Sequence, residues 1–403
     1  MKTLARQTEP RAYARTPTPQ AEPDATAAAA GEAASSADAF ASVGEPRPLA
    51  PARWDWSGVR SVLVVRLRSI GDTVLATPSL YALRRFLPGA RIDVLLEDWV
   101  APLLEGSDVV DRVVTVRRKS NASRLSVARQ LRAEGYDVAY NLHGGSTAAL
   151  LTRASGARQR VGFASYSYAA LHNHLAPPSA ELWGREKTHS AEQQLALLGW
   201  TGVPVTDRPA SRLAVGVEAS ASVTHRLRER AGLDGPQPFA LIHPAAAFDT
   251  KTWAAENFAR VVERLAARGL ATVAVAGPGE AKVIDEVRAH TRAPLAGFTD
   301  LSLPELTALA ARAAIFVGND SGVAHVAAAV GTPSVVVFGS SNVAHWRPWT
   351  TAPAEVVREE MPCAPCPGYA CAEFGAPECI RRVPVERVNA AVERVLKEVD
   401  SSQ

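Results

Sequence analysis

Two polar segments of this 403-residue chain combine residue types that could act on a phosphorylated substrate. The first segment, 66–73 (RLRSIGDT), follows an apolar run and carries one glycine and one carboxylate, Asp72. An aspartate at the start of a helix can cap it by accepting hydrogen bonds from free N–H groups. The same carboxylate can serve as a general base that takes a proton from a hydroxyl group. Spacing alone favours the cap and leaves the base open.

The second segment, 315–325 (IFVGNDSGVAH), runs from a strand pattern through a turn into a helix pattern. Its small residues would let a ligand approach the backbone, and the free N–H groups at the start of a helix attract anions. A diphosphate would suit such a turn. A plain capping turn of Asn, Asp and Ser is an equally good interpretation of the pattern.

Two further charged residues follow strand patterns in the second half of the chain. Lys251 stands before a helix, where its ammonium group could neutralise a leaving phosphate, although a single lysine is more often simply solvated. Glu280 follows 277–279 (GPG), and an acidic group beyond a strand can bind ribose hydroxyls. Glutamate also favours the first turn of a helix for electrostatic reasons. Each of these signals is weak by itself.

Short apolar strand patterns alternate with helix patterns through most of the chain, which predicts βαβ units in parallel sheets. The first half has strand patterns at 61–66, 92–96, 113–116 and 137–141. The second half has them at 239–243, 272–276, 315–317 and 335–338. Pro and Gly residues interrupt the alternation between 175 and 236. The predicted fold class is therefore α/β, with two doubly wound parallel sheets.

The same patterns divide the chain into five segments. Residues 1–56 are rich in Ala, Pro, Ser, Thr and Glu without sustained apolar periodicity, and we expect a disordered tail there. A first Rossmann-like domain is expected at 57–205, a linker at 206–236, a second Rossmann-like domain at 237–383, and a final helix and tail at 384–403.

Composition excludes several classes of protein. A net charge of +3 is too small an excess for a nucleic-acid binder, whose basic residues form a concentrated face. No run approaches the roughly 20 apolar residues needed to cross a bilayer. The first residues lack the apolar core of a secretory signal. We therefore expect a soluble, cytoplasmic protein that does not bind nucleic acid.

Taken together, these motifs resemble glycosyltransferase family 9, the heptosyltransferase family of lipopolysaccharide synthesis. The most specific matching segments are 64–72 (VVRLRSIGD), 318–322 (GNDSG) and 327–333 (AAAVGTP), and the Lys251-x-Trp253 motif supports them. The resemblance extends over residues 61–395. It implies a GT-B architecture, in which two Rossmann-like domains face each other across a cleft.

The resemblance also implies an inverting transfer in which Asp72 is the base. The donor would be a nucleotide-diphosphate sugar, with ADP-heptose as the family's donor, and the acceptor would be a lipid-linked glycan at the inner membrane face. No cofactor is expected for catalysis, and the sequence lacks the Asp-x-Asp pair by which metal-dependent transferases hold a cation. The predicted donor-binding residues are Ser69, Gly71, Lys251, Glu280, Asn319, Asp320, Ser321, Gly322 and His325.

All four cysteines, Cys363, Cys366, Cys371 and Cys379, lie in one short window. Four thiolates within reach of one another could hold a structural zinc ion or an iron–sulfur cluster. Reduced thiols without a metal are an equally good interpretation, and disulfides are a third. None of the three gives the cysteines a catalytic role.

A basic run in the first half, which includes Arg112, Arg117, Arg118 and Lys119, is a candidate for acceptor binding. In the resembled family this domain faces the acceptor, and the anionic groups of a lipid-linked core could attract the run to the membrane surface. A solvated helix face with acidic residues nearby explains the run slightly better.

Two other functions are open at the level of sequence. A nucleotide-sugar epimerase or hydrolase can share this architecture, and so can a non-catalytic nucleotide-sugar binding protein, because a fold does not fix a reaction. Asp72 separates these hypotheses. Its replacement would abolish transfer and leave nucleotide binding intact, whereas an epimerase would convert the nucleotide sugar with no acceptor present.

Overall fold

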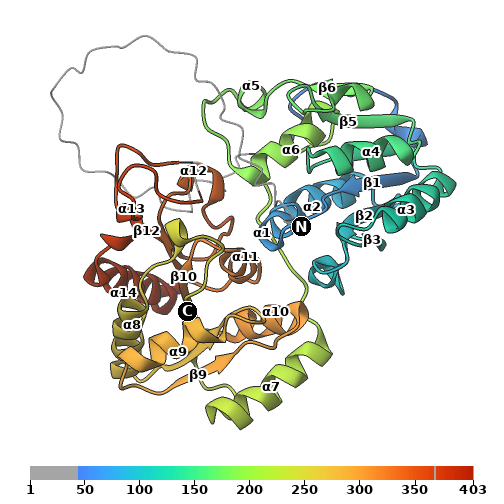
Figure 1. Cartoon of the computed structure of the whole chain (residues 1–403). Helices are drawn as coiled ribbons and strands as arrows, with labels where there is room; N and C mark the ends of the chain where they lie inside the picture. Colours follow the sequence, from blue (N-terminus) through green and yellow to red (C-terminus); the bar gives the residue numbers. More distant parts are fainter. Residues whose placement is uncertain (1–43, 367–368, 403) are drawn as a thin grey trace, which may run out of the picture. The chain divides into compact units, whose positions relative to one another are not determined.

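Two six-stranded parallel β-sheets form the framework of the chain (Figure 1). A computed structural model describes residues 44–366 and 369–402, all within one compact unit of the chain. Residues 1–43 of the predicted disordered tail lie outside the described part. Among the helices that the structure describes, none is long and apolar enough to cross a membrane.

The first sheet has the strand order β3-β2-β1-β4-β5-β6, and all neighbouring strands are parallel. Its strands are β1 (Ser61–Val65), β2 (Arg91–Glu97), β3 (Arg112–Val116), β4 (Val138–Asn141), β5 (Gln159–Phe163) and β6 (His174–Ala176). The accompanying helices are α1 (Ile70–Val74), α2 (Thr77–Phe86), α3 (Asn121–Glu134), α4 (Ser146–Ala154), α5 (Ser179–Trp183) and α6 (Ser190–Trp200).

Helices cover both faces of this sheet. Every residue of β1 is buried. Val62 and Val64 share a hydrophobic cluster with residues of α2 and α6. Leu63 and Val65, which point to the other face, share a second cluster with residues of α3 and α4. A strand buried on both faces is typical of parallel sheets and explains why β1 reads as an unbroken apolar run.

The second sheet has the order β12-β11-β10-β7-β8-β9, again with all neighbours parallel. Its strands are β7 (Phe239–His243), β8 (Ala271–Val275), β9 (Leu295–Phe298), β10 (Ile315–Asn319), β11 (Ser334–Phe338) and β12 (Ala354–Arg358). The accompanying helices are α7 (Val217–Ala231), α8 (Ala255–Ala267), α9 (Ala281–His290), α10 (Leu303–Arg312), α11 (Gly322–Ala329), α12 (Val343–Trp346), α13 (Glu378–Arg381) and α14 (Val385–Ser402). The predicted pair of doubly wound parallel sheets is confirmed.

Each sheet reverses its strand order beside its first strand. β1 lies between β2 and β4, and β7 lies between β8 and β10. In doubly wound sheets, ligands bind beyond the carboxyl ends of the strands at such a switch point. The segment after β1 carries Asp72, the segment after β7 carries Lys251, and the turn after β10 carries Asp320. The topology therefore puts the predicted chemical groups where such folds bind ligands.

The predicted linker, 206–236, contains a helix of the second domain. Helix α7 packs on α10 and β9, and its Val223 and Leu227 are buried. Gly and Pro residues around the helix suggest a linker in the sequence, but its apolar stripe has a partner in the second sheet. The final helix, α14, also belongs to this domain, since Val388 and Val392 share a cluster with strand residues of the second sheet.

Residues 47–56 pack against the first domain. Leu49 and Ala50 donate their backbone N–H groups to the carbonyl of Gly199, at 3.0 and 3.1 Å. The indole Nε1 of Trp56 donates to the carbonyl of Thr201 at 3.0 Å. The predicted end of the tail at residue 56 is therefore too late, because this segment has both apolar side chains and backbone partners at the end of α6.

Candidate functional site

Asp72 is held by groups on both of its carboxylate oxygens. Its Oδ1 forms an ion pair with the guanidinium of Arg66. Its Oδ2 accepts hydrogen bonds from the backbone N and the Oγ of Ser69, at 3.3 and 3.2 Å. Asp72 and Ser69 form a capping box at the start of α1. The side chain of Asp72 is still 23% exposed, so the helix cap also leaves a carboxylate that a substrate can reach.

The start of α1 touches the start of α11 from the other domain. A Cβ built on Gly71 would lie 2.7 Å from Cδ2 of His325, and one built on Gly322 would lie 2.8 Å from Cβ of Ile70. Distances this short are not found for real Cβ atoms, so glycine at both positions allows the close approach. The contact brings the segment of Asp72 beside the turn after β10.

His325 lies among the charged groups of the site. Burial lowers its pKa most strongly, the carboxylates of Asp320 and Asp72 raise it, and the ammonium of Lys251 lowers it. Within the described residues, the Nδ1 atom of His325 has no hydrogen-bond partner. The ring is therefore a neutral polar group that lies near both Asp72, from the first domain, and Lys251, from the second.

Lys251 and Asp320 form an ion pair at the carboxyl ends of β7 and β10. The Lys251 Nζ atom lies 2.8 Å from Oδ2 of Asp320, and the side chains are 23% and 6% exposed. The buried carboxylate fixes the ammonium group at a position that remains open to solvent. The ammonium group can donate a hydrogen bond to an anionic ligand from its exposed side while Asp320 holds it in place.

Asn319 supports this pair and is not itself accessible. Its side chain is fully buried. Its Nδ2 donates to the carbonyl of Pro244 at 2.8 Å, and its Oδ1 accepts from the backbone N of Trp253 at 3.1 Å. The prediction that Asn319 binds the donor directly is therefore corrected: the amide ties the loop after β7 to β10 and thereby positions Lys251.

Ser321 and Gly322 begin α11, whose first N–H groups have no partner inside the helix. The Oγ of Ser321 is buried and has no hydrogen-bond partner in the part of the chain that the structure describes. Glu280 lies at the start of α9, after β8, and is exposed. Its Oε2 accepts a hydrogen bond from the backbone N of Gly277 at 2.7 Å. Together with Lys251 after β7, these groups follow three neighbouring strands of the second sheet, β10, β7 and β8.

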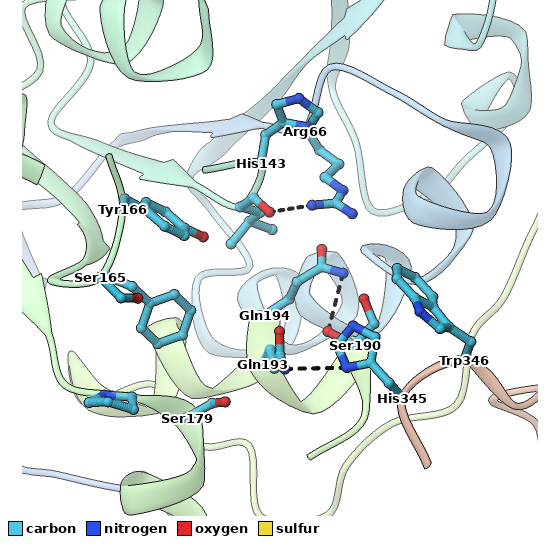
Figure 2. Close-up of a pocket in the computed structure, with 13 residues that line it drawn as sticks. Arg66, His143, Ser165, Tyr166, Ser179, Ser190, Gln193, Gln194, His345 and Trp346 are labelled. Carbon is cyan, nitrogen blue, oxygen red and sulfur yellow. Dashed lines mark hydrogen bonds between the residues drawn. The ribbon is translucent and has the colours of Figure 1, made fainter. Parts of the chain in front are cut away.

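A pocket of about 350 Å³ lies beside Arg66 (Figure 2). It is bounded by the carboxyl ends of strands of the first sheet, by α6, and by His345 and Trp346 of α12. Burial lowers the pKa of His143 to about 4, and the charge of Arg66 adds to this. Burial also lowers the pKa of His345. Sequence reasoning missed this pocket, because no local motif marks residues that meet from so many separate segments.

The predicted acceptor-binding arginine at position 112 is engaged in the fold. Arg112 donates to the buried carboxylate of Asp93 and to Glu134, both at 2.7 Å, and to the hydroxyl of Tyr136 at 3.2 Å. This network joins β2, β3 and the end of α3, so Arg112 has a structural role, and the predicted acceptor contact stays a prediction. The other three predicted residues, Arg117, Arg118 and Lys119, are exposed after β3.

The four cysteines are free thiols in the segment between β12 and α14. The pKa of Cys379 is raised by burial and by the neighbouring Cys366, with smaller effects from Cys363 and Cys371. The thiols are therefore near one another. In the described residues, however, no group of three or more His, Cys, Asp or Glu side chains is arranged to hold a metal ion.

Comparison with known proteins identifies the family of this chain. The family described as "Glycosyltransferase family 9 (heptosyltransferase)" matches residues 124–376. Lipopolysaccharide heptosyltransferase 3 of Escherichia coli K12 is 30% identical over 301 residues, which cover 70% of this chain and 84% of that protein.

Two solved structures share the fold. The glycosyl transferase family 9 protein from Veillonella parvula DSM 2008 aligns with a TM-score of 0.74 and 22% identity, over 84% of this chain and 98% of that chain. The E. coli ADP-heptose LPS heptosyltransferase II aligns with a TM-score of 0.70 and 22% identity, over 84% and 99%. The predicted family and the GT-B architecture are confirmed. With its two Rossmann-like domains and its match over most of its length, the chain belongs to glycosyltransferase family 9, the heptosyltransferase family.

Proposed function

We propose that this glycosyltransferase moves a heptose, with inversion, from a nucleotide diphosphate to a hydroxyl group of a lipopolysaccharide-core or related envelope glycan. The observation that carries the proposal is the placement of His325, which lies near Asp72 on one side and near the Lys251–Asp320 pair on the other. This placement supports a site in which a proton acceptor from the first domain and a phosphate-neutralising cation from the second act on one sugar phosphate.

In the proposed reaction, the acceptor oxygen attacks the anomeric carbon from the face opposite the diphosphate. The new C–O bond forms while the bond to the diphosphate oxygen breaks, and Asp72 takes the proton of the acceptor hydroxyl. The bonding electrons leave with the diphosphate. Lys251 and the N–H groups at the start of α11 stabilise that charge. These groups supply the charge neutralisation without a catalytic cofactor, so we expect a chelator to leave the rate unchanged.

Asp72→Asn tests the role of the base. The amide can still cap α1 but cannot accept a proton, so transfer should fall by about 10²- to 10⁴-fold, while the dissociation constant of the nucleotide stays within about twofold. The transfer rate is measured as the release of nucleoside diphosphate in the presence of acceptor. The dissociation constant of the nucleotide is measured by calorimetry.

Glu305→Gln is the matched control. Glu305 is likewise the acidic member of a capping box, at the start of α10, and it pairs with Arg226. The Glu305→Gln variant should lose about as much stability as Asp72→Asn, but it should keep the wild-type transfer rate. An Asp72→Asn enzyme with full activity would overturn the assignment of the base. Conversion of the nucleotide sugar without an acceptor would instead favour an epimerase or hydrolase.

The donor nucleotide is proposed to be ADP, because the chain belongs to the heptosyltransferase family and a relative of the same fold is named for ADP-heptose. Ligands that bind only the folded state raise the melting temperature by mass action. We expect ADP to raise it more than UDP, GDP or CMP at equal concentration. The rise should disappear in Lys251→Ala, which removes the ammonium group. Equal shifts for all four nucleotides would contradict the proposal.

The acceptor is proposed to be lipid-linked, which would bring the enzyme to the inner face of the membrane. The exposed Arg117, Arg118 and Lys119 support contact with an anionic surface. Co-sedimentation with anionic vesicles should exceed that with neutral vesicles and should fall in the triple alanine variant. Equal binding of the wild type and the triple alanine variant to anionic vesicles would mean that these three residues do not contact the membrane.

A structural metal at the four cysteines is proposed from their proximity. Because the described arrangement holds no ready metal site, binding would require the segment 363–379 to adjust. Elemental analysis of protein purified without chelator should find about one zinc ion per chain, or iron with visible absorbance. Four thiols that react freely with a thiol reagent in metal-free, fully active protein would contradict it.

A further inference from the structure

The pocket beside Arg66 lies within reach of the proposed base. Arg66 lines it and forms the ion pair with Asp72. Two other lining residues, His143 from the first domain and His345 from the second, feel the charge of Asp72. A molecule bound in the pocket therefore lies beside Arg66, the residue that holds Asp72.

The charges around the pocket are balanced or absent. The guanidinium of Arg66 is paired with Asp72. The lowered pKa values of His143 and His345 keep both rings neutral at pH 7. The remaining polar lining consists of hydroxyl and amide groups. Arg68, which also acts on His143, is exposed and is not part of the lining.

Two polar atoms of the lining need partners. Gln194 is only 4% exposed, and its Nε2 donates to the carbonyl of Leu75 at 3.2 Å. Its Oε1 has no partner within the described residues, and neither does Nδ1 of His143. Buried polar atoms without partners are costly, and hydroxyl groups can both donate to and accept from such atoms. The lining therefore suits a ligand rich in hydroxyls.

Aromatic rings complete the wall. Phe163, Tyr166 and Trp346 line the same space, and Figure 2 shows Tyr166 and Trp346 on opposite sides of the amide and histidine groups. Aromatic faces pack well against the apolar C–H faces of a sugar ring. A volume of about 350 Å³ is at the small end of ligand pockets, which suits one sugar ring better than a longer glycan.

We propose that this pocket binds the acceptor sugar that carries the attacked hydroxyl, and that it selects a neutral polyhydroxy sugar over one that bears a carboxylate. The inference rests on the proposed transferase function and adds the chemical class of the acceptor. A carboxylate in this pocket would be desolvated without a free counter-ion, since Arg66 is already paired, and such burial is unfavourable. A neutral sugar meets no such penalty.

Gln193 is the residue with which to test the selection. It lies in α6, is half-buried, and its Nε2 lies 3.3 Å from Nδ1 of His345. The two side chains thus meet across the pocket from different domains, as the dashed line in Figure 2 shows. Gln193→Arg adds a cation to the lining, and Gln193→Leu removes the amide. Gln237→Arg, on an exposed residue before β7, is the matched control.

The experiment compares two synthetic pyranoside acceptors that differ only in a hydroxymethyl or a carboxylate group. The wild type should use the neutral acceptor with a kcat/KM at least about tenfold higher. Gln193→Arg should reduce or invert that ratio, and Gln193→Leu should raise the KM of the neutral acceptor several-fold with unchanged nucleotide binding. Gln237→Arg should match the wild type. Equal use of both acceptors by the wild type, or Gln193 variants with wild-type acceptor KM, would overturn the proposal.

A binding measurement separates this proposal from the proposed function. Saturation-transfer NMR on Asp72→Asn detects acceptor binding without turnover. Binding of the neutral acceptor, weakened by Gln193→Leu, supports the pocket even if no donor is turned over by the wild type. Turnover by the wild type combined with no dependence of binding on Gln193 leaves the transferase intact and removes the pocket as its acceptor site.

Discussion

At the scale of single residues, structural and chemical roles coincide at Asp72. The sequence offers a helix cap and a general base as alternatives, and the geometry accommodates both, because Ser69 engages one oxygen and Arg66 the other while part of the carboxylate stays exposed. The ion pair with Arg66 fixes the orientation of the carboxylate. A base that is already oriented does not have to be ordered when the acceptor arrives.

His143 gives a prediction about pH. Its pKa is lowered from 6.5 to about 4. Between these two pH values, His143 is therefore protonated in the unfolded chain and neutral in the folded chain. The stability that depends on neutral His143 is present above pH 6.5 and is lost as the pH falls toward 4, at up to about 1.4 kcal/mol per pH unit. Urea unfolding at pH 7 and pH 5 should show a smaller decrease for His143→Gln than for the wild type.

The exposed His225 of α7 is the control for this measurement. His225→Gln should follow the wild-type dependence of unfolding free energy on pH. If His143→Gln loses as much stability between pH 7 and pH 5 as the wild type does, the buried imidazole of His143 is not a source of that dependence.

At the scale of elements, the close contact of α1 with α11 depends on Gly71. In an ordinary helix position alanine is favoured over glycine by about 1 kcal/mol. Here the added methyl group would meet the ring of His325 at 2.7 Å, and overpacking of this kind costs about 1–3 kcal/mol. We therefore expect Gly71→Ala to destabilise the wild type and to be neutral or stabilising in a His325→Ala background, as measured in a double-mutant cycle by urea unfolding.

Gly89→Ala serves as the control for this cycle, since a Cβ at Gly89 would meet nothing within 4 Å. Its effect should be the same in both backgrounds. Equal destabilisation by Gly71→Ala with and without the histidine ring would show that the crowding arises elsewhere.

The elements differ in how well the sequence predicts them. Central strands such as β1 and β7 are buried on both faces, and their unbroken apolar runs are visible in the sequence. Strands β5, β6, β9 and β12 lie at or next to the sheet edges, where short segments such as LAGF can pair without a strong apolar pattern. Helix α7 is hard to assign to its domain from the sequence for a related reason, because the elements on which it packs are distant in sequence.

The candidate site shows the same limit. Motif order predicts Asp72, Lys251 and Asp320, because each follows a strand that is itself easy to recognise. The supporting role of Asn319 and the engagement of Arg112 depend on partners 66 to 75 and 19 to 24 residues away. Tertiary packing decides which side chains are bonded within the fold and which stay accessible to a ligand. No local sequence pattern contains that information.

At the scale of the whole molecule, several contacts hold the domains in register, and two of them lie close to the candidate site. One is the α1–α11 contact, and the other joins the start of α6 to the segment after α12. There, Nδ1 of His189 accepts from the backbone N of Ala191 at 3.1 Å, and Nε2 donates to the carbonyl of Arg347 at 2.9 Å. The ring also stacks on Trp349, with centroids 4.5 Å apart. Asp72 and Lys251 come from different domains, so their relative position depends on such contacts.

His189→Phe should therefore slow transfer without weakening either ligand. Phenylalanine keeps a ring to stack on Trp349 but loses the hydrogen bonds to Arg347 and to the backbone N of Ala191. The Ala191 bond lies within the first domain, so its loss should lower stability only. The Arg347 bond joins the domains and is worth about 1 kcal/mol, so kcat should fall by up to about fivefold as fewer molecules hold the domains in register. The dissociation constant of the nucleotide should not change, because the proposed phosphate-binding groups, Lys251 and the start of α11, lie in the second domain. His174→Phe is the control, since Nε2 of His174 likewise forms a hydrogen bond, here with the side chain of Gln159, and its ring packs on a tryptophan, but both contacts stay within the first domain. If both variants keep the wild-type kcat, the α6 contact does not set the register of the two domains during catalysis.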